Sequence, residues 1–439
     1  MPGGFRFAGD DALRKRRGKA AADGLAQLDR PQSALYQERS QRLAALGVLL
    51  IVLFAAALHE SEYNVNEPSG PFVWSMTPAT LTNAPALRHH PSLPDSHLPW
   101  MPERLLGPTT KHFPAVFVLD SSTNSSSSGV REAGAALRAL IDDKLPQFGA
   151  MIVRQLPIEN EQAFSALMAA TGLNLVDYIG GVTSRPVVAP KVTPTSTEGP
   201  QVAMEPHVDN PYWPRPPSHL FLWAKTPPSR GGKSIITDAR AVLRQLQVER
   251  PDIVAGLRTR RVRYSHWYPD RARGGITSWE ESLACKTRAG AEQKLRDGGF
   301  SWEWVEGGLK KWEVAEPIRQ HPITGEETWA NMITAMHCSV FDNHPDYRSL
   351  QRPLAERDKP CRLRGDMPYD TSFGNDGEAF PVDWLHAMRS AQWGNSVTFD
   401  YMPGDVLIVD NYSTMHGRFS WEPAVRREIY MAMVAPPGK

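Results

Sequence analysis

Two side chains that could share one metal ion, His207 and Asp209, are separated by a single residue in the segment 204–213 (MEPHVDNPYW). In an extended strand every second side chain points to the same face, so an imidazole nitrogen and a carboxylate oxygen at this spacing can reach one cation. The pair by itself is not specific, because a His-x-Asp sequence often arises by chance. A metal site therefore requires a further ligand from elsewhere in the chain.

A second segment supplies a further histidine and a cation. Residues 403–405 (PGD) form a turn before the apolar run 406–410, and His416 and Arg427 follow. Two histidines and one carboxylate, with the other coordination positions open, are the ligand set of non-haem Fe(II) oxygenases. Arg427 begins an alternating strand, and its guanidinium can pair bidentately with a carboxylate such as that of 2-oxoglutarate. Together the two segments predict an iron-dependent oxygenase.

The elements that must position these residues are read from the apolar pattern. Residues 115–119 and 150–154 predict strands, and residues 130–145 and 161–171 predict amphipathic helices. The chain then alternates short apolar runs with Pro/Gly turns and long insertions. We therefore predict one catalytic domain over residues 113–439, mainly β with flanking helices.

These motifs, in this order, resemble the taurine/2,4-D dioxygenase family of Fe(II)/2-oxoglutarate-dependent oxygenases. The sequence is most similar to the branch that contains the syringomycin-biosynthesis hydroxylase. The resemblance covers roughly residues 115–435 and leaves the N-terminal part outside. Besides the metal motif it rests on short blocks in the family's order: 195–200 (TSTEGP), 227–234 (PPSRGGKS) with Asp238 and Arg240, Arg263-Tyr264, 321–326 (HPITGE) with Trp329 and Asn331, Asp410-Asn411, 416–418 (HGR) and Ala432-Met433.

The resemblance implies that His207, Asp209 and His416 hold Fe(II). It also implies a double-stranded β-helix, a jelly roll whose two sheets surround the metal and whose helices lie outside. Such an enzyme uses Fe(II), 2-oxoglutarate as cosubstrate and O₂, and we expect ascorbate to help its turnover. Its products are succinate, CO₂ and an oxidised substrate.

The resemblance also assigns the cosubstrate site. It places the far carboxylate of 2-oxoglutarate on Arg427, assisted by the hydroxyl of Ser234, where the family usually has threonine. Arg426 is the competing anchor, because the loop after His416 looks one residue longer than in the branch. Arg418 matches a family motif, and we expect it to support the metal ligands from behind.

Three further residues are candidates for contact with the substrate. In the taurine enzymes a second arginine, four residues after the cosubstrate arginine, holds the substrate sulfonate. Met431 occupies that place here, so taurine is disfavoured. Tyr212 and Asn331 match motif positions near the expected pocket mouth, although Tyr212 could simply pack and Asn331 could cap a strand. We expect His337 to be a core histidine rather than a fourth ligand.

The expected reaction is hydroxylation, desaturation or ring closure of a small molecule or an amino-acid-derived metabolite. A related halogenase needs a small residue in place of Asp209 to make room for chloride, so Asp209 disfavours it. Two alternatives are a membrane-tethered binding protein on an inactive oxygenase scaffold and a hydrolytic metalloenzyme that does not use 2-oxoglutarate. Retention of all three ligands together with Arg427 favours the oxygenase.

Charge and cysteine content exclude other classes of protein. The chain has 49 Lys and Arg against 48 Asp and Glu, and this net charge of +1 provides no general attraction to nucleic acid. Cys285, Cys338 and Cys361 are too few for a cysteine-rich zinc module and allow one disulfide at most. The sequence leaves open whether any two of them pair, and it leaves the oligomeric state open.

The first 112 residues are built differently from the rest. Residues 1–42 contain nine Lys and Arg against five Asp and Glu and predict a disordered basic tail. Residues 43–58 (LAALGVLLIVLFAAAL) are all apolar or glycine, and as a helix they span roughly 24 Å, which a thin bilayer tolerates. We therefore expect a transmembrane signal-anchor. Residues 59–112 are rich in proline and predict a semi-extended stem.

The basic tail favours the cytosolic side of the membrane. The expected arrangement is a single-pass type II protein whose catalytic domain lies in the lumen of the endomembrane system. Cleavage after the small residues Ala55, Ala56 and Ala57 would instead give a secreted protein. An organelle transit sequence is a further alternative.

We predict that the full-length protein stays in the membrane pellet through a carbonate wash, because the apolar segment is held in the bilayer. An N-terminal tag should remain intact and accessible from the cytosol. Asn124 lies in an Asn-Ser-Ser sequon, so its glycosylation should report a lumenal domain. A soluble product that lacks its first 57 residues would contradict the anchor and indicate a signal peptide.

Overall fold

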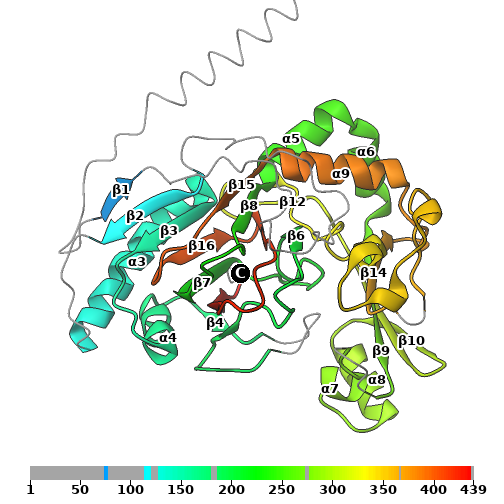
Figure 1. Cartoon of the computed structure of the whole chain (residues 1–439), viewed down its shortest axis with the longest axis horizontal. Coiled ribbons are helices and arrows are strands. Elements are labelled where there is room, and N and C mark those ends of the chain that lie inside the picture. Colours follow the sequence, from blue (N-terminus) through cyan, green and yellow to red (C-terminus); the bar gives the residue numbers. More distant parts are fainter. Residues whose placement is uncertain are drawn as a thin grey trace, which may run out of the picture. The chain divides into compact units, whose positions relative to one another are not determined.

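The computed structural model describes residues 74–77, 113–119, 127–178, 185–271, 276–364 and 367–436. The predicted basic tail and the apolar segment 43–58 lie outside these residues. Among the described helices, none is long and apolar enough to cross a membrane. The described chain is mainly β with helices packed around its sheets, as the sequence predicts (Figure 1).

The larger of the two main sheets has eight strands. Its pairs are antiparallel except for β2 with β3, which run parallel. In order across the sheet the strands are β1 (Trp74–Thr77), β2 (Ala115–Leu119), β3 (Ala150–Arg154), β16 (Val406–Asp410), β7 (His219–Thr226), β18 (Glu428–Val434) and β4 (Leu175–Val176), and β5 (Thr193–Pro194) pairs with β18 beside this path.

The smaller main sheet has four strands, all paired antiparallel. Their order is β15 (Ser396–Phe399), β8 (Ser234–Asp238), β17 (Thr414–Arg418) and β6 (Met204–His207). Both predicted histidine ligands lie in this sheet, on neighbouring strands.

One hydrophobic core lies between the two sheets. Leu222 and Met431 of the larger sheet belong to it together with Ile236 and Phe399 of the smaller sheet. Burying an apolar side chain of this size contributes about 1.5–3 kcal/mol of stability. The two sheets are thus held face to face by their alternating apolar side chains.

The outer face of the larger sheet is covered by helices α3 (Ser127–Phe148) and α4 (Glu161–Ala170) (Figure 1). Phe164 of α4 stacks on Trp223 of β7, with ring centroids 5.5 Å apart. Because both faces of this sheet are covered, β16 is buried along its whole length, and its residues 406–409 form a continuous apolar run before Asp410.

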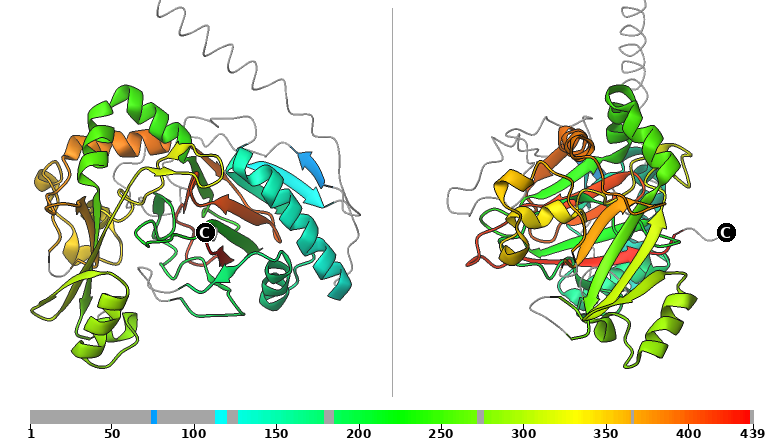
Figure 2. Two further views of the ribbon diagram at one scale, coloured as in Figure 1. Left: turned by 180° about the vertical axis from the view of Figure 1, so that it is seen from behind. Right: turned by 90° about the vertical axis from the view of Figure 1, so that its right-hand side faces the viewer.

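A long insertion separates β8 from β15, which are neighbours in the smaller sheet. It begins at the N-cap Asp238, whose Oδ1 accepts hydrogen bonds from the amides of Arg240 (2.9 Å) and Ala241 (3.3 Å). Figure 2 shows the insertion gathered on one side of the two sheets. Its elements are α5 (Ala239–Glu249), α6 (Pro251–Arg260), β9 (Val262–Pro269), α7 (Trp279–Ser282), α8 (Arg288–Asp297), β10 (Ser301–Val305), β11 (Gly308–Ala315), β12 (Arg319–Gln320), β13 (Glu327–Thr328), η1 (Cys338–Asn343), η2 (Arg348–Leu350), η3 (Leu354–Glu356), β14 (Tyr369–Phe373) and α9 (Val382–Gly394).

The first local predictions agree closely with the structure. The predicted strands 115–119 and 150–154 are β2 and β3. Helix α3 extends beyond the predicted range 130–145 at both ends and passes Pro146 in its last turn. It stops at Gly149, whose φ of 73° is in the left-handed region that favours glycine.

The structure contains two long-range contacts that were not predicted from the sequence, a strand pairing and a disulfide. Within the segment expected to be a semi-extended stem, residues 74–77 form β1, which pairs with the edge of β2. Cys338 and Cys361 form a disulfide with their Cα atoms 6.1 Å apart, and Cys285 is free. The disulfide ties η1 to the segment before β14, so it closes part of the insertion.

The smaller sheet and the insertion are joined by an ion pair between Glu205 of β6 and Arg389 of α9. The Nε of Arg389 lies 3.0 Å from both carboxylate oxygens of Glu205, and each side chain is 1% exposed. The guanidinium also donates to the carbonyl of Thr334 (3.2 Å) and to the hydroxyl of Ser339 (3.0 Å). Strand β6 is therefore fixed to α9 by a fully buried charge.

We predict that Arg389→Met lowers the free energy of unfolding by about 3–5 kcal/mol, because it leaves the Glu205 carboxylate buried without its cation. Urea unfolding followed by circular dichroism measures the change. The double variant Glu205→Met/Arg389→Met should recover most of the loss.

The matched control for this prediction is Arg138→Met, which removes an exposed pair with Asp142 in α3. We expect it to cost at most about 0.5 kcal/mol. Equal effects of the Arg138 and Arg389 variants would contradict a special role for the buried pair.

Candidate active site

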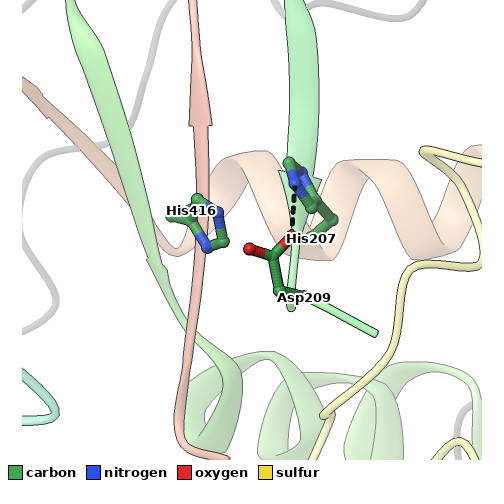
Figure 3. Close-up of side chains that lie close together, drawn as sticks. All are labelled: His207, Asp209 and His416. Carbon is green, nitrogen blue, oxygen red and sulfur yellow. Dashed lines mark ion pairs between the residues drawn. The ribbon is translucent and has the colours of Figure 1, made fainter. Parts of the chain in front are cut away.

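The antiparallel pairing of β6 with β17 brings the two predicted histidine ligands together. In this register His207 lies opposite His416, and the centroids of the two rings are 4.5 Å apart. Figure 3 shows the two rings on neighbouring strands with Asp209 beyond the end of β6. Residues more than two hundred positions apart in the chain thus meet at one point.

Asp209 completes a group of three possible ligands. Its Oδ1 lies 3.8 Å from Nε2 of His207, the contact drawn as a dashed line in Figure 3. One ligand atom from each of the three side chains lies within 4.8 Å of the others. Asp209 Oδ2 and His416 Nδ1 are buried and have no hydrogen-bond partner in the described part of the chain. Buried polar atoms are normally paired, so this donor set fits a divalent cation such as Fe(II).

The electrostatics of the group suit a metal. Burial and the neighbouring His207 lower the pKa of His416 to about 3, so its imidazole is neutral near pH 7 and can act as a ligand. Burial acts to raise the pKa of Asp209, but electrostatic interactions with His416, Arg185 and His207 oppose it, and the net pKa is lowered. Asp209 is therefore an ionised carboxylate.

Asn411, directly after β16, braces the segment that carries Asp209. Its Oδ1 accepts from the amide of Asp209 (2.9 Å), and its Nδ2 donates to the carbonyls of Asp209 and Pro217 (both 2.9 Å). Asn210 has a φ of 51°, a left-handed conformation that asparagine tolerates better than most residues. Hydrogen bonds to the amide and to the carbonyl of Asp209 thus hold the start of this turn.

A first cavity opens beside the three ligands. Both His207 and Asp209 lie in its wall, which combines apolar and aromatic side chains with polar and charged ones. A cavity with apolar walls and a few polar groups is the usual form of a small-molecule site. Its other lining residues are Tyr178, Arg185, Ser196, Glu198, Val202, Ala203, Met204, Glu205, Asn210, Tyr212, Met332, Ala335, Met336, Val340, His344 and Tyr369.

A second cavity is lined by all three ligands and by the predicted cosubstrate residues Arg427 and Ser234, and it has His207 and Asp209 in common with the first. Arg427 is partly exposed, and desolvation by the surrounding protein lowers its pKa to about 10. Its Nε has no hydrogen-bond partner in the described part of the chain, while its guanidinium carbon lies 5.2 Å from the centroid of the Trp421 ring. A protonated guanidinium with no carboxylate partner in the part of the chain that the structure describes suits a carboxylate ligand.

Arg426 points the other way. Its side chain is 72% exposed and pairs with Glu428 at 2.7 Å. Ile429 and Met431 line the second cavity with Arg427, so the predicted face of the last strand is found in the structure. The geometry thus favours Arg427 over Arg426 as an anchor.

Two neighbours shape this second cavity. Ser234 hydrogen-bonds Tyr401, whose pKa is raised by burial, and both residues line the cavity. Arg418 is buried in β17 and donates to the backbone carbonyls of Val202 and Glu198. It therefore ties the loop before β6 to the strand of His416, which agrees with the expected supporting position.

The three predicted substrate residues have different surroundings. Tyr212 lines the first cavity, and its hydroxyl donates to Oδ1 of Asn210 (3.3 Å). Met431 lies in the second cavity instead. Asn331 lines neither; its Nδ2 donates to the carbonyl of Pro317 (3.1 Å), and its carbonyl accepts from the amide of Val208 (3.3 Å). The contacts of Asn331 are thus those of a structural residue, which is the alternative to substrate contact that the sequence left open.

His337 is 1% exposed, and its Nδ1 lies 2.8 Å from the hydroxyl of Ser339. It lies outside the group of His207, Asp209 and His416, and in the second group of possible ligands, His337, Cys338 and Asp370, the sulfur of Cys338 is bonded to Cys361. Sequence reasoning missed Tyr401 and Arg185 in the cavity walls. Neither belongs to a recognisable motif or to a periodic pattern that points to the site, so the sequence carried no signal for them.

The chain is similar to several known proteins. The dapdiamide synthesis protein DdaC of Enterobacter agglomerans is 27% identical over 291 residues, which are 65% of this chain and 83% of that protein. A clavaminate synthase-like protein of Arabidopsis thaliana is 24% identical over 292 residues, covering 65% and 82%. A solved taurine dioxygenase from Burkholderia xenovorans has a TM-score of 0.39 and 15% identity, covering 77% of this chain and 90% of that one.

A family model described as "Taurine catabolism dioxygenase TauD, TfdA family" matches residues 117–433. The match spans well over half of the chain and includes all three clustered ligands and Arg427. The chain therefore belongs to the TauD, TfdA family, and it is an Fe(II)- and 2-oxoglutarate-dependent dioxygenase that uses O₂.

Proposed function

We propose that His207, Asp209 and His416 hold the Fe(II) of this dioxygenase. The observation that carries the proposal is the meeting of three ligand side chains, two buried and one partly exposed, in the wall of the second cavity, with His207 and Asp209 also lining the first. We also propose that the two main sheets form a double-stranded β-helix around the iron. Four strands of that fold would be β6, β8, β15 and β17, and the other four β5, β7, β16 and β18.

The second cavity is proposed to hold 2-oxoglutarate. Arg427 would pair with the far carboxylate, and Ser234 would add a hydroxyl donor. Both residues lie in the wall of this cavity, and Arg427 lacks a carboxylate partner among the described residues. The cosubstrate would thus lie next to the iron, leaving the first cavity to the substrate.

When bound, Fe(II), 2-oxoglutarate and O₂ supply the oxidation of a C–H bond with release of succinate and CO₂. The chain's own residues hold the metal with three side chains and fix the cosubstrate from one end. The apolar and aromatic side chains in the wall of the first cavity keep bulk water away and position one C–H bond of the substrate.

We propose that the substrate is a small molecule or an amino-acid-derived metabolite that is hydroxylated, desaturated or cyclised. The mixed polar and apolar wall of the first cavity and the relative named for dapdiamide synthesis support a metabolite. Asp209 occupies the place that chloride would need in a halogenase. A membrane tether at residues 43–58 stays part of the proposal, and the carbonate wash tests it.

Succinate release tests the proposed reaction. Full-length protein with Fe(II), ascorbate and 2-oxoglutarate should form succinate slowly by itself and faster with the correct metabolite. Metabolite profiles of a knockout against wild type should supply candidates for that metabolite. Turnover of a candidate that is independent of 2-oxoglutarate would contradict the proposal and indicate a hydrolytic metalloenzyme.

We expect His207→Ala, Asp209→Ala and His416→Ala each to lose Fe(II) binding and succinate formation, because a three-ligand site has no redundant partner. Equilibrium dialysis against Fe(II) under argon measures binding apart from turnover. His337→Ala is the control, since this histidine lies outside the group and its variant should keep its iron. Unchanged binding in one of the three ligand variants would remove that residue from the site.

Arg427→Gln should raise the apparent KM for 2-oxoglutarate by roughly two orders of magnitude, because it removes two charge-assisted hydrogen bonds of about 1.5–3 kcal/mol each. Fe(II) binding should persist, because the three ligands are untouched. Arg426→Gln is the matched control and should have little effect, since its side chain lies outside the cavity. Ser234→Ala should show a smaller rise than Arg427→Gln. The reverse order of the two arginine variants would contradict the proposed anchor.

A further inference from the structure

His321 and Asp410 form a buried pair that none of the roles above uses, although both belong to sequence blocks on which the family resemblance rests. The Nε2 of His321 lies 2.5 Å from Oδ2 of Asp410, and each side chain is 3% exposed. His321 follows β12 in the insertion, whereas Asp410 is the last residue of β16 in the larger sheet. The pair therefore ties the insertion to the end of β16.

The turn that begins at His321 fixes which ring nitrogen carries the proton. Residues 321–326 connect β12 to β13, its antiparallel partner. Within this turn, Nδ1 of His321 accepts hydrogen bonds from the amides of Ile323 (3.2 Å) and Thr324 (3.1 Å). A ring nitrogen that accepts from an amide carries no proton, so the ring proton is on Nε2. His321 therefore donates to the carboxylate of Asp410.

The carboxylate of Asp410 shapes the turn that follows β16. Its Oδ1 accepts from the amide of Tyr412 (2.9 Å), while its Oδ2 accepts from His321. An aspartate that accepts from the amide two residues later stabilises a tight turn. The backbone carbonyl of Asp410 also accepts from the amide of Ser413 (3.2 Å). The residue enclosed by this turn is Asn411.

Asn411 connects this turn to Asp209. Its side chain bonds both the amide and the carbonyl of Asp209 at 2.9 Å, and its own amide donates to the carbonyl of Ser218 (2.9 Å). Asn411 is 2% exposed, so these bonds do not compete with bulk water. Hydrogen bonds and one short turn thus lead from His321 to the backbone of a metal ligand.

A second buried carboxylate lies at the other end of the same strand. Asp405 directly precedes β16, its side chain is 2% exposed, and its Oδ1 accepts from Nε of Arg154 (3.1 Å). Its Oδ2 accepts from the amide of Met402 (2.9 Å), so this carboxylate also holds a turn. Of the two turns, only the one after Asp410 contains a residue that hydrogen-bonds Asp209 among the contacts described here.

We propose that His321 is a positioning residue for the carboxylate ligand Asp209. By holding Asp410, it sets the turn that directs Asn411 to the backbone of Asp209. This inference rests on the proposed function, because it takes Asp209 as a ligand of Fe(II). Removing a residue that supports a metal ligand from behind changes metal affinity by about 10–100-fold. His321 acts through two further residues, so we expect a change at the lower end of this range.

Two substitutions of His321 separate its two contacts. His321→Gln keeps a donor nitrogen close to the position of Nε2 but removes the acceptor for the turn amides. His321→Asn keeps an acceptor for those amides but is too short to reach Asp410. The Kd of Fe(II) for full-length protein, measured by equilibrium dialysis under argon, should rise about tenfold in His321→Asn and less than about threefold in His321→Gln.

Asp410→Asn tests the same contact from the other side. The amide keeps an acceptor for Tyr412 and almost the same volume, but it replaces the charged partner of His321. The Kd of Fe(II) should rise about tenfold, as in His321→Asn. This variant also serves if His321→Asn does not give folded protein.

Two further measurements separate positioning from general stability. The d–d absorption spectrum of the Co(II)-loaded protein reports ligand geometry, so it should change in His321→Asn and remain that of wild type in His321→Gln. In the background Asn411→Ala, the substitution His321→Asn should change the Kd of Fe(II) by less than about twofold, because the connection to Asp209 is already broken.

Arg154→Met is the matched control, because it removes the buried pair at the other end of β16. Its Kd of Fe(II) should stay within about threefold of wild type, whatever the change in its urea midpoint. Equal rises in Arg154→Met and His321→Asn would overturn the inference and indicate a general loss of stability in β16.

Two other outcomes would also overturn the inference. The Kd of Fe(II) could rise at least as much in His321→Gln as in His321→Asn, which would make the turn amides the important partners. It could also remain at the wild-type value in both His321→Asn and Asp410→Asn. Failure of the proposed function itself would be visible separately, as an Asp209→Ala variant that binds Fe(II) like wild type.

Discussion

The active-site geometry depends on the antiparallel register between β6 and β17. Backbone hydrogen bonds set His416 opposite His207, and β8 holds β17 from its other side. A slip of one residue would turn one imidazole to the opposite face of the sheet, because side chains alternate with a period of two. The cluster of ligands is therefore a consequence of strand pairing, and Asp209 joins it because it follows β6 directly.

Strong polar contacts to β6 and to the segment that follows it stabilise this register. Asn411 hydrogen-bonds both the amide and the carbonyl of Asp209, and Arg389 forms an ion pair with Glu205 in the middle of β6. Arg389 belongs to α9 in the insertion, so a segment outside the two main sheets positions the metal ligands. A buried ion pair adds little net stability compared with apolar packing, because desolvation offsets its attraction. We interpret its role as fixing position.

The two cavities divide the chemistry between them. The second is polar at one end, where Arg427, Ser234 and Tyr401 gather. The first has more apolar and aromatic side chains in its wall, and Arg185 lines both. Low dielectric surroundings strengthen each charge interaction in these walls. A site of this kind can bind two different molecules beside one metal, each through its own set of residues.

The sequence by itself determined the local elements and the residue types of the site. Strands β2 and β3 were predictable because apolar runs report burial, and the cavity face of the last strand followed from alternation between Arg427, Ile429 and Met431. Only the tertiary structure decided which distant residues meet: the Cys338–Cys361 disulfide, the burial of Asn331 away from the cavities, and the contact of Arg185 with Met431 across 246 positions. Periodicity records which way a side chain faces, whereas long-range contacts depend on the packing of whole sheets and on loops that have no repeating pattern.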